Sequence, residues 1–311
     1  MSAVISGSLA YDVIMRFPGR FGDHILPERI HKLSVAFMVS ELRREFGGCA
    51  GNIAYTLTLL GERALPLGAA GRDFAPYAKW LDQNGIARES ILELGDVYTA
   101  QAFINTDNDG NQITAFYPGA MARAHEQTLP RIADARIGIV APDGRDAMIR
   151  RAEEFAAAGI PFLFDPGQGL PMFDGSDLEY FLQRASWLAM NDYEAGVFCE
   201  KTRLGLDEIA DKLKAVIVTR GAHGSVVHAE GNQYDIPAVE PNAVVDPTGC
   251  GDAYRAGLLY GLLHDLEWET TGRIASLAGS IKIASEGTQN HRFTPAEFAA
   301  RFEAAFGYSF H

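Results

Sequence analysis

The sequence contains few cysteines and no long apolar run. Cysteine occurs at positions 49, 199 and 250 and never as a CxxC pair, so neither a zinc site nor a disulfide framework is expected. No segment approaches about 18 consecutive apolar residues, the length typical of a transmembrane helix. The N-terminus also lacks the basic segment and the apolar stretch of a signal peptide, so we expect a cytoplasmic protein.

Positive charge is scarce as well. The formal net charge of the 311 residues is −13, and Lys and Arg form only pairs such as Arg43-Arg44 and Arg150-Arg151. A chain of this charge repels nucleic acid and anionic membranes, so we expect neither as a partner. The GxxxxGK[ST] element of P-loop kinases is also absent. Phosphates could still be bound locally, by backbone amides or through a metal ion.

Short apolar runs alternate with helical patterns along most of the chain. The predicted strands are Ala3–Ile5, Ile137–Ala141, Phe162–Phe164, Trp187–Met190 and Ala215–Thr219. The predicted helices are Gly51–Leu60, Arg145–Ala158, one beginning at Glu194–Cys199, and Ile274–Ser285. This βαβ rhythm predicts a single α/β domain over residues 1–311, with a mostly parallel central sheet covered by helices on both faces.

Polar residues follow several of these strands. Asp165, Asn191 and Thr219 each stand where a predicted strand ends. Ligands of open parallel sheets bind outside the carboxyl ends of the strands. We therefore expect these residues to mark one edge of the sheet that carries a site.

Two segments, about residues 13–46 and 97–119, break the rhythm with alternating β patterns. Within the second, the turn-forming run 105–111 separates Ala100–Ile104 from Gln112–Tyr117, which predicts a hairpin. We expect the two segments to form a small second sheet that serves as a lid.

The most informative stretch lies near the C-terminus, where two glycines precede a helical pattern. Gly249 and Gly251 let the backbone approach a ligand closely. The amides of residues 249–252 would lie at a helix N-terminus, an arrangement that binds anions. Asp252 itself has two interpretations, a helix cap or a general base that takes a proton from a hydroxyl.

A second glycine-rich stretch, Gly47-Gly48-Cys49-Ala50-Gly51-Asn52, lies far upstream. Taken alone it could be a plain loop before a helix. Together with the C-terminal stretch it resembles the two signatures of the ribokinase (PfkB) family, and the resemblance covers nearly the whole chain. The resemblance implies a ribokinase-like three-layer α/β/α fold and ATP-dependent phosphorylation of an alcohol group. Cys250 departs from the family pattern, which has Ala or another small residue at that position.

The same resemblance implies roles for individual residues. The catalytic set is Asp252 as base, with the anion hole formed by Gly249, Cys250 and Gly251. The sugar of the substrate would be held by Asp12, Gly47, Gly48 and Asn52. ATP would contact Asn191, Thr219, Gly221, Gly224 and Gln289. Mg²⁺ would be held by Asn191 and Glu194 through water, although the same N-x-x-E pattern also fits an ordinary helix cap.

The acceptor is less strongly indicated than the reaction. The segments Tyr117-Pro118-Gly119-Ala120 and Gly287-Thr288-Gln289-Asn290 resemble the nucleoside-kinase branch of the family more than ribokinase or fructokinase. Candidate contacts to the nucleobase are Gln101, Phe103, Gln112 and Tyr117, with Phe37, Met38 and Phe116 as further apolar candidates. The apolar members could equally pack the lid or a dimer interface.

The prediction is therefore a nucleoside kinase that phosphorylates the 5′-hydroxyl of adenosine, with inosine and guanosine as further candidates. A sugar kinase and a catalytically silent nucleoside-binding protein are the alternatives. The sequence leaves open a monovalent-cation requirement and a homodimer formed through the lid. Since His223, His228 and His291 have no metal-ligand spacing, we expect ordinary surface or loop histidines.

Overall fold

The computed structural model describes residues 2–25, 34–130 and 134–310, and in these ranges a nine-stranded sheet forms the centre of the molecule. Its strands are β1 (Ser2–Ser6), β4 (Arg63–Gly71), β5 (Ile91–Leu94), β8 (Ala135–Val140), β9 (Phe162–Phe164), β10 (Trp187–Asn191), β11 (Ala215–Thr219), β12 (Ser225–Ala229) and β13 (Asn232–Ile236). They are ordered β13-β12-β11-β10-β9-β8-β1-β4-β5. Pairing is parallel from β5 to β11, and β12 is antiparallel to both of its neighbours.

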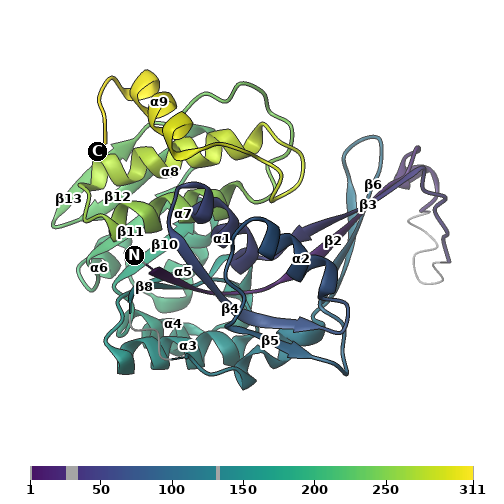
Figure 1. Cartoon of the computed structure of the whole chain (residues 1–311), viewed down its shortest axis with the longest axis horizontal. Helices are drawn as coiled ribbons and strands as arrows, with labels where there is room; N and C mark the ends of the chain where they lie inside the picture. Colours follow the sequence, from purple (N-terminus) through teal and green to yellow (C-terminus); the bar gives the residue numbers. More distant parts are fainter. Residues whose placement is uncertain (1, 26–33, 131–133, 311) are drawn as a thin grey trace.

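Helices cover both faces of this sheet (Figure 1). One face carries α1 (Cys49–Leu59), α2 (Ala75–Gln83), α7 (Cys250–Leu263), α8 (Trp268–Ile283) and α9 (Pro295–Phe306). The other carries α3 (Arg145–Ala158), α4 (Gly175–Leu182), α5 (Asp192–Thr202) and α6 (Leu206–Ala210). Short 3-10 helices follow some strands and loops: η1 (Phe21–Asp23), η3 (Gly119–Glu126), η4 (Gly167–Met172) and η5 (Gly221–His223).

The strand period of two explains how one sheet supports two cores. In β1, Ala3 and Ile5 pack into the core that includes α1, α7 and α8. Val4, which lies between them, packs into the core with α3 and α4. Successive side chains of a strand point to opposite faces, so a continuous apolar run fills both cores. The predicted three-layer α/β/α fold is confirmed.

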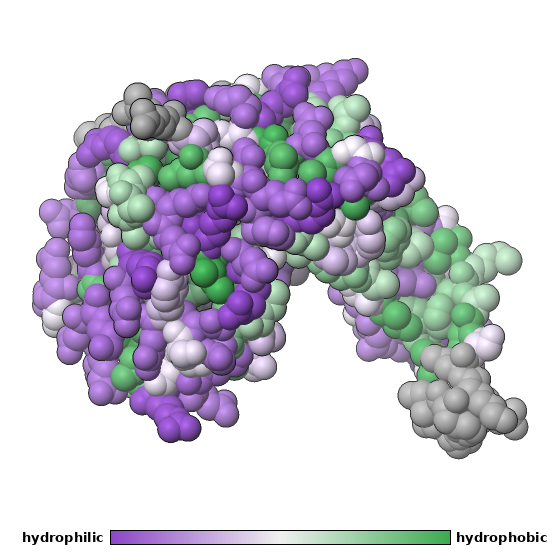
Figure 2. All heavy atoms as spheres, turned by 90° about the horizontal axis from the view of Figure 1, so that it is seen from below, coloured by the Kyte–Doolittle hydropathy of each residue, from purple (hydrophilic) through white to green (hydrophobic). Residues whose placement is uncertain are grey.

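A separate four-stranded sheet extends from one end of the body (Figure 1). It consists of β2 (Ala10–Arg16), β3 (Glu41–Gly47), β6 (Ala100–Thr106) and β7 (Gln112–Tyr117), in the order β3-β2-β6-β7. The predicted small sheet is therefore present, although residues 26–33 of the first predicted segment lie outside the described residues. Figure 2 shows apolar side chains gathered along this arm.

The hairpin predicted for β6 and β7 is also confirmed, and its turn is organised by one carboxylate. Asp107 is only 4% exposed and accepts hydrogen bonds from the backbone amides of Phe21, Asp109 and Asn111. These bonds close the turn and attach it to the loop that follows β2.

In the part of the chain that the structure describes, no helix combines the length and the apolar composition that crossing a membrane would require.

Candidate active site

The N-terminus of α7 lies between two cavities. Gly249 is the residue that precedes the helix, with φ +80° in the left-handed region. Gly249 and Asp252 border the first cavity, which has a volume of about 470 Å³. Cys250 and Gly251 border the second cavity, of about 520 Å³. The helix start therefore lies between the two cavities, with Asp252 on the side of the first and Cys250 and Gly251 on the side of the second.

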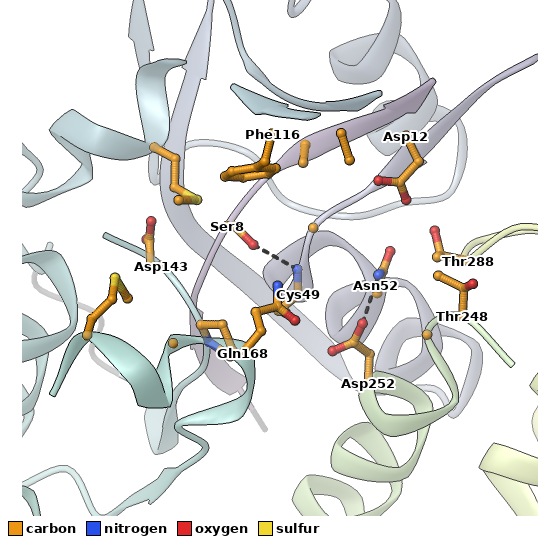
Figure 3. Close-up of a pocket in the computed structure, with 18 residues that line it drawn as sticks. Ser8, Asp12, Cys49, Asn52, Phe116, Asp143, Gln168, Thr248, Asp252 and Thr288 are labelled. Atoms are coloured by element: carbon orange, nitrogen blue, oxygen red, sulfur yellow. Dashed lines mark hydrogen bonds between the residues drawn. The ribbon is translucent and has the colours of Figure 1, made fainter. Parts of the chain in front are cut away.

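Asp252 is partly buried and accepts a hydrogen bond of 2.8 Å from the side-chain amide of Asn52 (Figure 3). Burial raises the pKa of Asp252 to about 6, the charge of Asp165 adds to this, and the Asn52 bond and Arg255 oppose it. A carboxyl group with a pKa near 6 is ionised at neutral pH but remains a stronger base than an exposed aspartate. It is thus suited to accept a proton from a hydroxyl.

A buried ion pair anchors the same helix. Arg255 donates from Nε and Nη2 to the two carboxylate oxygens of Asp165, each at 3.1 Å, and both side chains are 6% exposed. Asp165 follows β9, so the pair ties the first turns of α7 to the carboxyl edge of the sheet. This confirms that the polar residue after β9 lies at the edge that carries the site.

The small sheet forms the opposite wall of the first cavity. Asp12 of β2 pairs with Ala102 of β6, which pairs with Phe116 of β7, and all three border the cavity. Figure 3 shows the Asp12 carboxylate pointing into the cavity across from Asp252. Burial raises the pKa of Asp12 to about 6, with Glu45 adding to the effect.

Strand geometry corrects three predicted substrate contacts. Gln101, Phe103 and Tyr117 lie one residue from Ala102 and Phe116 along their strands, and therefore point to the sheet face away from the first cavity. Gln101 is bonded to Asp73 there, while the rings of Phe103 and Tyr117 are partly exposed. The pattern of alternation was visible in the sequence, but which face met the cavity was not.

Gln112, the fourth predicted contact, lies on the cavity-facing side. It borders a smaller adjoining cavity of about 230 Å³, together with Asp12 and Thr288.

The glycines that connect β3 to α1 bring backbone against Asp12 and β1. Gly48 has φ +87°, and a Cβ there would lie 2.5 Å from the carbonyl oxygen of Ser8. A Cβ on Gly47 would lie 2.5 Å from Oδ2 of Asp12. Only glycine fits this close approach. The structure thus brings Asp12, Gly47, Gly48 and Asn52 together beside the first cavity, as the sequence predicted.

On the side of the second cavity, Thr219 at the end of β11 and the glycines of the following turn, Gly221 and Gly224, share the wall with Cys250 and Gly251. These residues come from two distant segments, and the structure places them around one space.

Asn191 and Glu194 form a reciprocal capping box at the start of α5. The Asn191 side chain accepts from the Glu194 amide, and the Glu194 carboxylate accepts from the Asn191 amide, each at 2.8 Å. Among the described residues no group of three His, Cys, Asp or Glu could hold a metal ion. Burial raises the pKa of Glu194, and the charge of Asp165 adds to this. Asn191 and Glu194 thus form the ordinary helix cap that the sequence had left as the alternative to a Mg²⁺ site.

Gln289 does not lie where the sequence predicted. It was expected beside the ATP adenine, yet it is only 2% exposed and borders neither the first nor the second cavity. Its amide bonds to Asn52, Tyr77 and Trp80 behind the first cavity. The neighbouring His291, predicted as a surface or loop histidine, is 1% exposed, and burial lowers its pKa to about 3. The segment after residue 287 runs through the protein interior against α1, which the local sequence does not reveal.

Phe116, one of the apolar candidates for the nucleobase, borders the first cavity. Other cavity residues were not predicted: Met121 and Met172 provide apolar contact surface, and Asp143 and Gln168 are polar. In Figure 3 Asp143 lies on the side of the cavity away from Thr288.

The Asp143 side chain is 3% exposed, its carboxylate accepts from the Gly144 amide at 2.8 Å, and burial raises its pKa to about 7. Its position just after β8 is the same strand-end signal that marked Asp165, so the sequence did carry a means of finding it.

Comparison with known proteins identifies similar chains. A family model described as pfkB family carbohydrate kinase matches residues 19–295. A nucleoside kinase of Methanothermobacter thermautotrophicus is 35% identical over 276 residues, covering 87% of this chain and 88% of that one.

Two solved structures of a Burkholderia thailandensis nucleoside kinase are also similar. The complex with inosine has a TM-score of 0.90 and 50% identity and covers 99% of both chains. The complex described as ADP-inosine has a TM-score of 0.88 and 51% identity and covers 99% of this chain and 97% of that one.

Proposed function

The chain belongs to the pfkB family of carbohydrate kinases, and we propose that it is a nucleoside kinase that transfers the γ-phosphate of ATP to the 5′-hydroxyl of a purine nucleoside. Adenosine and inosine are the proposed acceptors, with guanosine as a further candidate. The nucleoside would occupy the first cavity and ATP the second.

The observation that carries this proposal is the position of the α7 N-terminus between the two cavities. Asp252 borders the first cavity, and Cys250 and Gly251, in the first turn of the helix, border the second. Phosphoryl transfer needs an acceptor hydroxyl next to a proton-accepting group and a phosphate next to positive charge, meeting at one point. A volume of about 470 Å³ in the first cavity suits a nucleoside-sized ligand.

In the proposed reaction Asp252 accepts the proton of the 5′-hydroxyl as its oxygen bonds to the γ-phosphorus, and ADP leaves with the electron pair of the broken P–O bond. The amides at the start of α7 stabilise the negative charge on the transferred group. Mg²⁺ would neutralise phosphate charge when bound, with Asn191 and Glu194 holding it through water.

Recognition of the nucleoside would divide between two parts of the cavity. Asp12 and the Gly47-Gly48 backbone would receive the ribose hydroxyls. Asn52 has a second amide hydrogen besides the one that Asp252 accepts, and it would donate that hydrogen to a ribose oxygen. The base would lie against Phe116 and the methionines, with Asp143 and Gln168 as its polar contacts.

The similar proteins support this choice of acceptor and donor. The Burkholderia enzyme that shares half of its residues with this chain is described in complex with inosine, and in a second structure with ADP-inosine. The cavity residues named above provide a matching combination of apolar surface and carboxylates.

The experiment that tests the proposal is a panel of nucleosides and sugars offered with ATP and Mg²⁺, with the products identified by mass. We expect 5′-monophosphates of adenosine and inosine. Asp252→Asn should retain nucleoside binding and lose turnover by roughly 10²- to 10⁴-fold. Asp207→Asn, an exposed carboxylate on α6, is the matched control and should match the wild type. Turnover of ribose or fructose alone would reject the nucleoside assignment, and an active Asp252→Asn would reject the base.

A further inference from the structure

The bond between Asn52 and Asp252 depends on which end of the Asn52 amide faces the carboxylate. An ionised carboxylate only accepts hydrogen bonds, so the NH₂ end of Asn52 attracts it and the oxygen end repels it. A rotation of half a turn about χ2 exchanges the two ends within nearly the same volume. Something must therefore fix the orientation that the structure shows.

A chain of hydrogen bonds behind Asn52 begins at Trp80. Its indole Nε1 donates to Oε1 of Gln289 at 3.0 Å. An indole N–H can only donate, so it determines which end of the Gln289 amide is the oxygen. The NH₂ end of Gln289 must then face the other way.

Both hydrogens of that NH₂ group are used. Gln289 Nε2 donates to Oδ1 of Asn52 at 3.0 Å and to the Tyr77 hydroxyl at 2.7 Å. Tyr77 in turn donates to the backbone carbonyl of Gly47 at 2.8 Å. Each group in the chain thus acts in the sense that its chemistry allows, from the donor-only indole to the acceptor-only carbonyl.

The same reasoning fixes Asn52. Its Oδ1 is taken by Gln289, so its Nδ2 is the end that faces Asp252, where it donates at 2.8 Å. If the amide of Asn52 rotated by half a turn, oxygen would face oxygen at Asp252 and NH₂ would face NH₂ at Gln289. That state loses two hydrogen bonds, of which the one to Gln289 is buried, and turns an amide oxygen toward the charged carboxylate.

Burial makes the chain of bonds stiff. Tyr77 is 0% exposed, Gln289 2% and Asn52 5%, so water has little access to compensate for a lost bond. Gly51 provides the space, since a Cβ there would clash with the Tyr77 hydroxyl and the Gln289 amide. The glycine of the N-terminal motif therefore serves the groups behind the site as well as the loop itself.

We propose that Gln289, held by Trp80 and Tyr77, is a positioning residue that keeps the NH₂ end of Asn52 on Asp252 and so stabilises the base in its charged form and in one orientation. The inference rests on the proposed role of Asp252 as the base. Gln289 itself borders neither the first nor the second cavity. It would therefore contact neither the acceptor nor ATP.

The charged groups around Asp252 define the expected pH effect. Burial raises the pKa of Asp252, Asp165 after β9 raises it further, and Asn52, Arg255 of α7 and Cys49 of α1 lower it. Loss of the oriented Asn52 donor removes one of the lowering contributions. The pKa of the base should therefore rise when Gln289 is replaced.

The test compares the pH dependence of kcat in the wild type, Gln289→Met and Trp80→Phe. Met has a similar length and no hydrogen-bonding amide. We expect the acid limb of kcat to move up by roughly one pH unit in Gln289→Met and by less in Trp80→Phe. The nucleoside Kd should rise by less than about tenfold, the loss expected for the single Asn52–ribose bond, because Asp12 and the Gly47-Gly48 backbone would still hold the ribose.

Gln127→Met is the matched control. The side-chain amide of Gln127, like that of Gln289, donates a hydrogen bond within the protein, here to the backbone carbonyl of Ser90. Gln127 lies outside the site. Its acid limb should coincide with that of the wild type.

A lower kcat in Gln289→Met with an unmoved acid limb would overturn the positioning role of Gln289 and leave it a structural role only. If that variant does not fold, Trp80→Phe decides the question on the same readout. If the wild type phosphorylates an alcohol other than a nucleoside, the proposed acceptor is wrong. The same pH series on the true acceptor then tests the positioning role of Gln289 by itself.

Discussion

At the residue scale, three carboxyl groups that border the first cavity have raised pKa values. Burial raises the pKa of Asp252 and of Asp12 to about 6 and that of Asp143 to about 7. Two of them, Asp12 and Asp252, would face the ribose and the 5′-hydroxyl, and Asp143 would face the base. A cavity lined in this way offers acceptors to a polyhydroxylated ligand at a cost in folding stability.

That cost can be measured at Asp252. Its folded pKa of about 6 exceeds the unfolded value of 3.8, so between these values the native state binds more protons. The contribution of this group to stability therefore falls as pH rises from about 4 to about 6 and stays constant above. Asn does not ionise, so Asp252→Asn should be more stable than the wild type at pH 8, on the order of 2 kcal/mol.

Urea unfolding at pH 8 and at pH 4 checks this prediction. The gain should be present at pH 8 and nearly absent at pH 4, where the native wild-type carboxyl is already neutral. A variant that is no more stable than the wild type at pH 8 would show that Asp252 ionises in the fold without penalty.

At the element scale, the proposed reaction depends on the start of α7, where two glycines have different roles. Gly249 precedes the helix in the left-handed region, and an added Cβ would lie 3.2 Å from the Thr288 side chain. Gly251 is inside the helix, and an added Cβ there would meet no atom within 4 Å. Gly249 is needed for the backbone conformation, whereas Gly251 keeps the space beside the helix start open.

Alanine substitutions separate these two requirements. Gly249→Ala should lose about 1–2 kcal/mol of stability, because a Cβ is strained at positive φ. Gly251→Ala should gain about 0.5–1 kcal/mol as a helical residue, while its methyl group intrudes on the second cavity and raises the KM for ATP. Denaturant unfolding and ATP kinetics measure both effects. Gly251→Ala with an unchanged KM for ATP would contradict the placement of the phosphates at this turn.

At the scale of the whole molecule, the small sheet has one face on the first cavity and one face in solvent. Leu42, Phe103, Ile113 and Tyr117 share the outer face by strand register and are 66%, 38%, 44% and 41% exposed. A row of apolar side chains on an exposed sheet is typical of an interaction surface. Phe103 and Tyr117, which the sequence suggested as contacts to the nucleobase, therefore fit the alternative that the sequence had left open, a dimer interface.

We predict that this outer face forms the interface of a homodimer. Light scattering after size-exclusion chromatography should give twice the chain mass of 33.8 kDa. Phe103→Glu combined with Ile113→Lys should give a monomer, because charge on the outer face cannot be buried without a partner. Tyr193→Glu, at an exposed position on the main body, is the control and should not alter the mass. A monomeric wild type would contradict the prediction.

The layered fold, the start of α7 and the β6–β7 hairpin could be predicted from local patterns in the sequence. The βαβ alternation predicted the layered fold, because strand and helix periods differ and buried parallel strands are apolar throughout. The glycines at 249 and 251 predicted the start of a helix, which α7 confirms, and Asp107 closes the hairpin that the run 105–111 predicted. These features depend on residues close together in the chain, so the sequence alone determined them.

The tertiary structure decided which of those residues meet. Neighbours on a strand point to opposite faces, so the register of β2, β6 and β7 placed Phe116 in the cavity and Phe103 outside. Gln289 bonds to Asn52 across 237 residues of sequence, and no local pattern records such a contact. The sequence therefore determined that Asp252 lies in the first turn of a helix that follows a glycine-rich turn. The packing of α1 against the buried segment after residue 287 determined what holds that carboxylate in place.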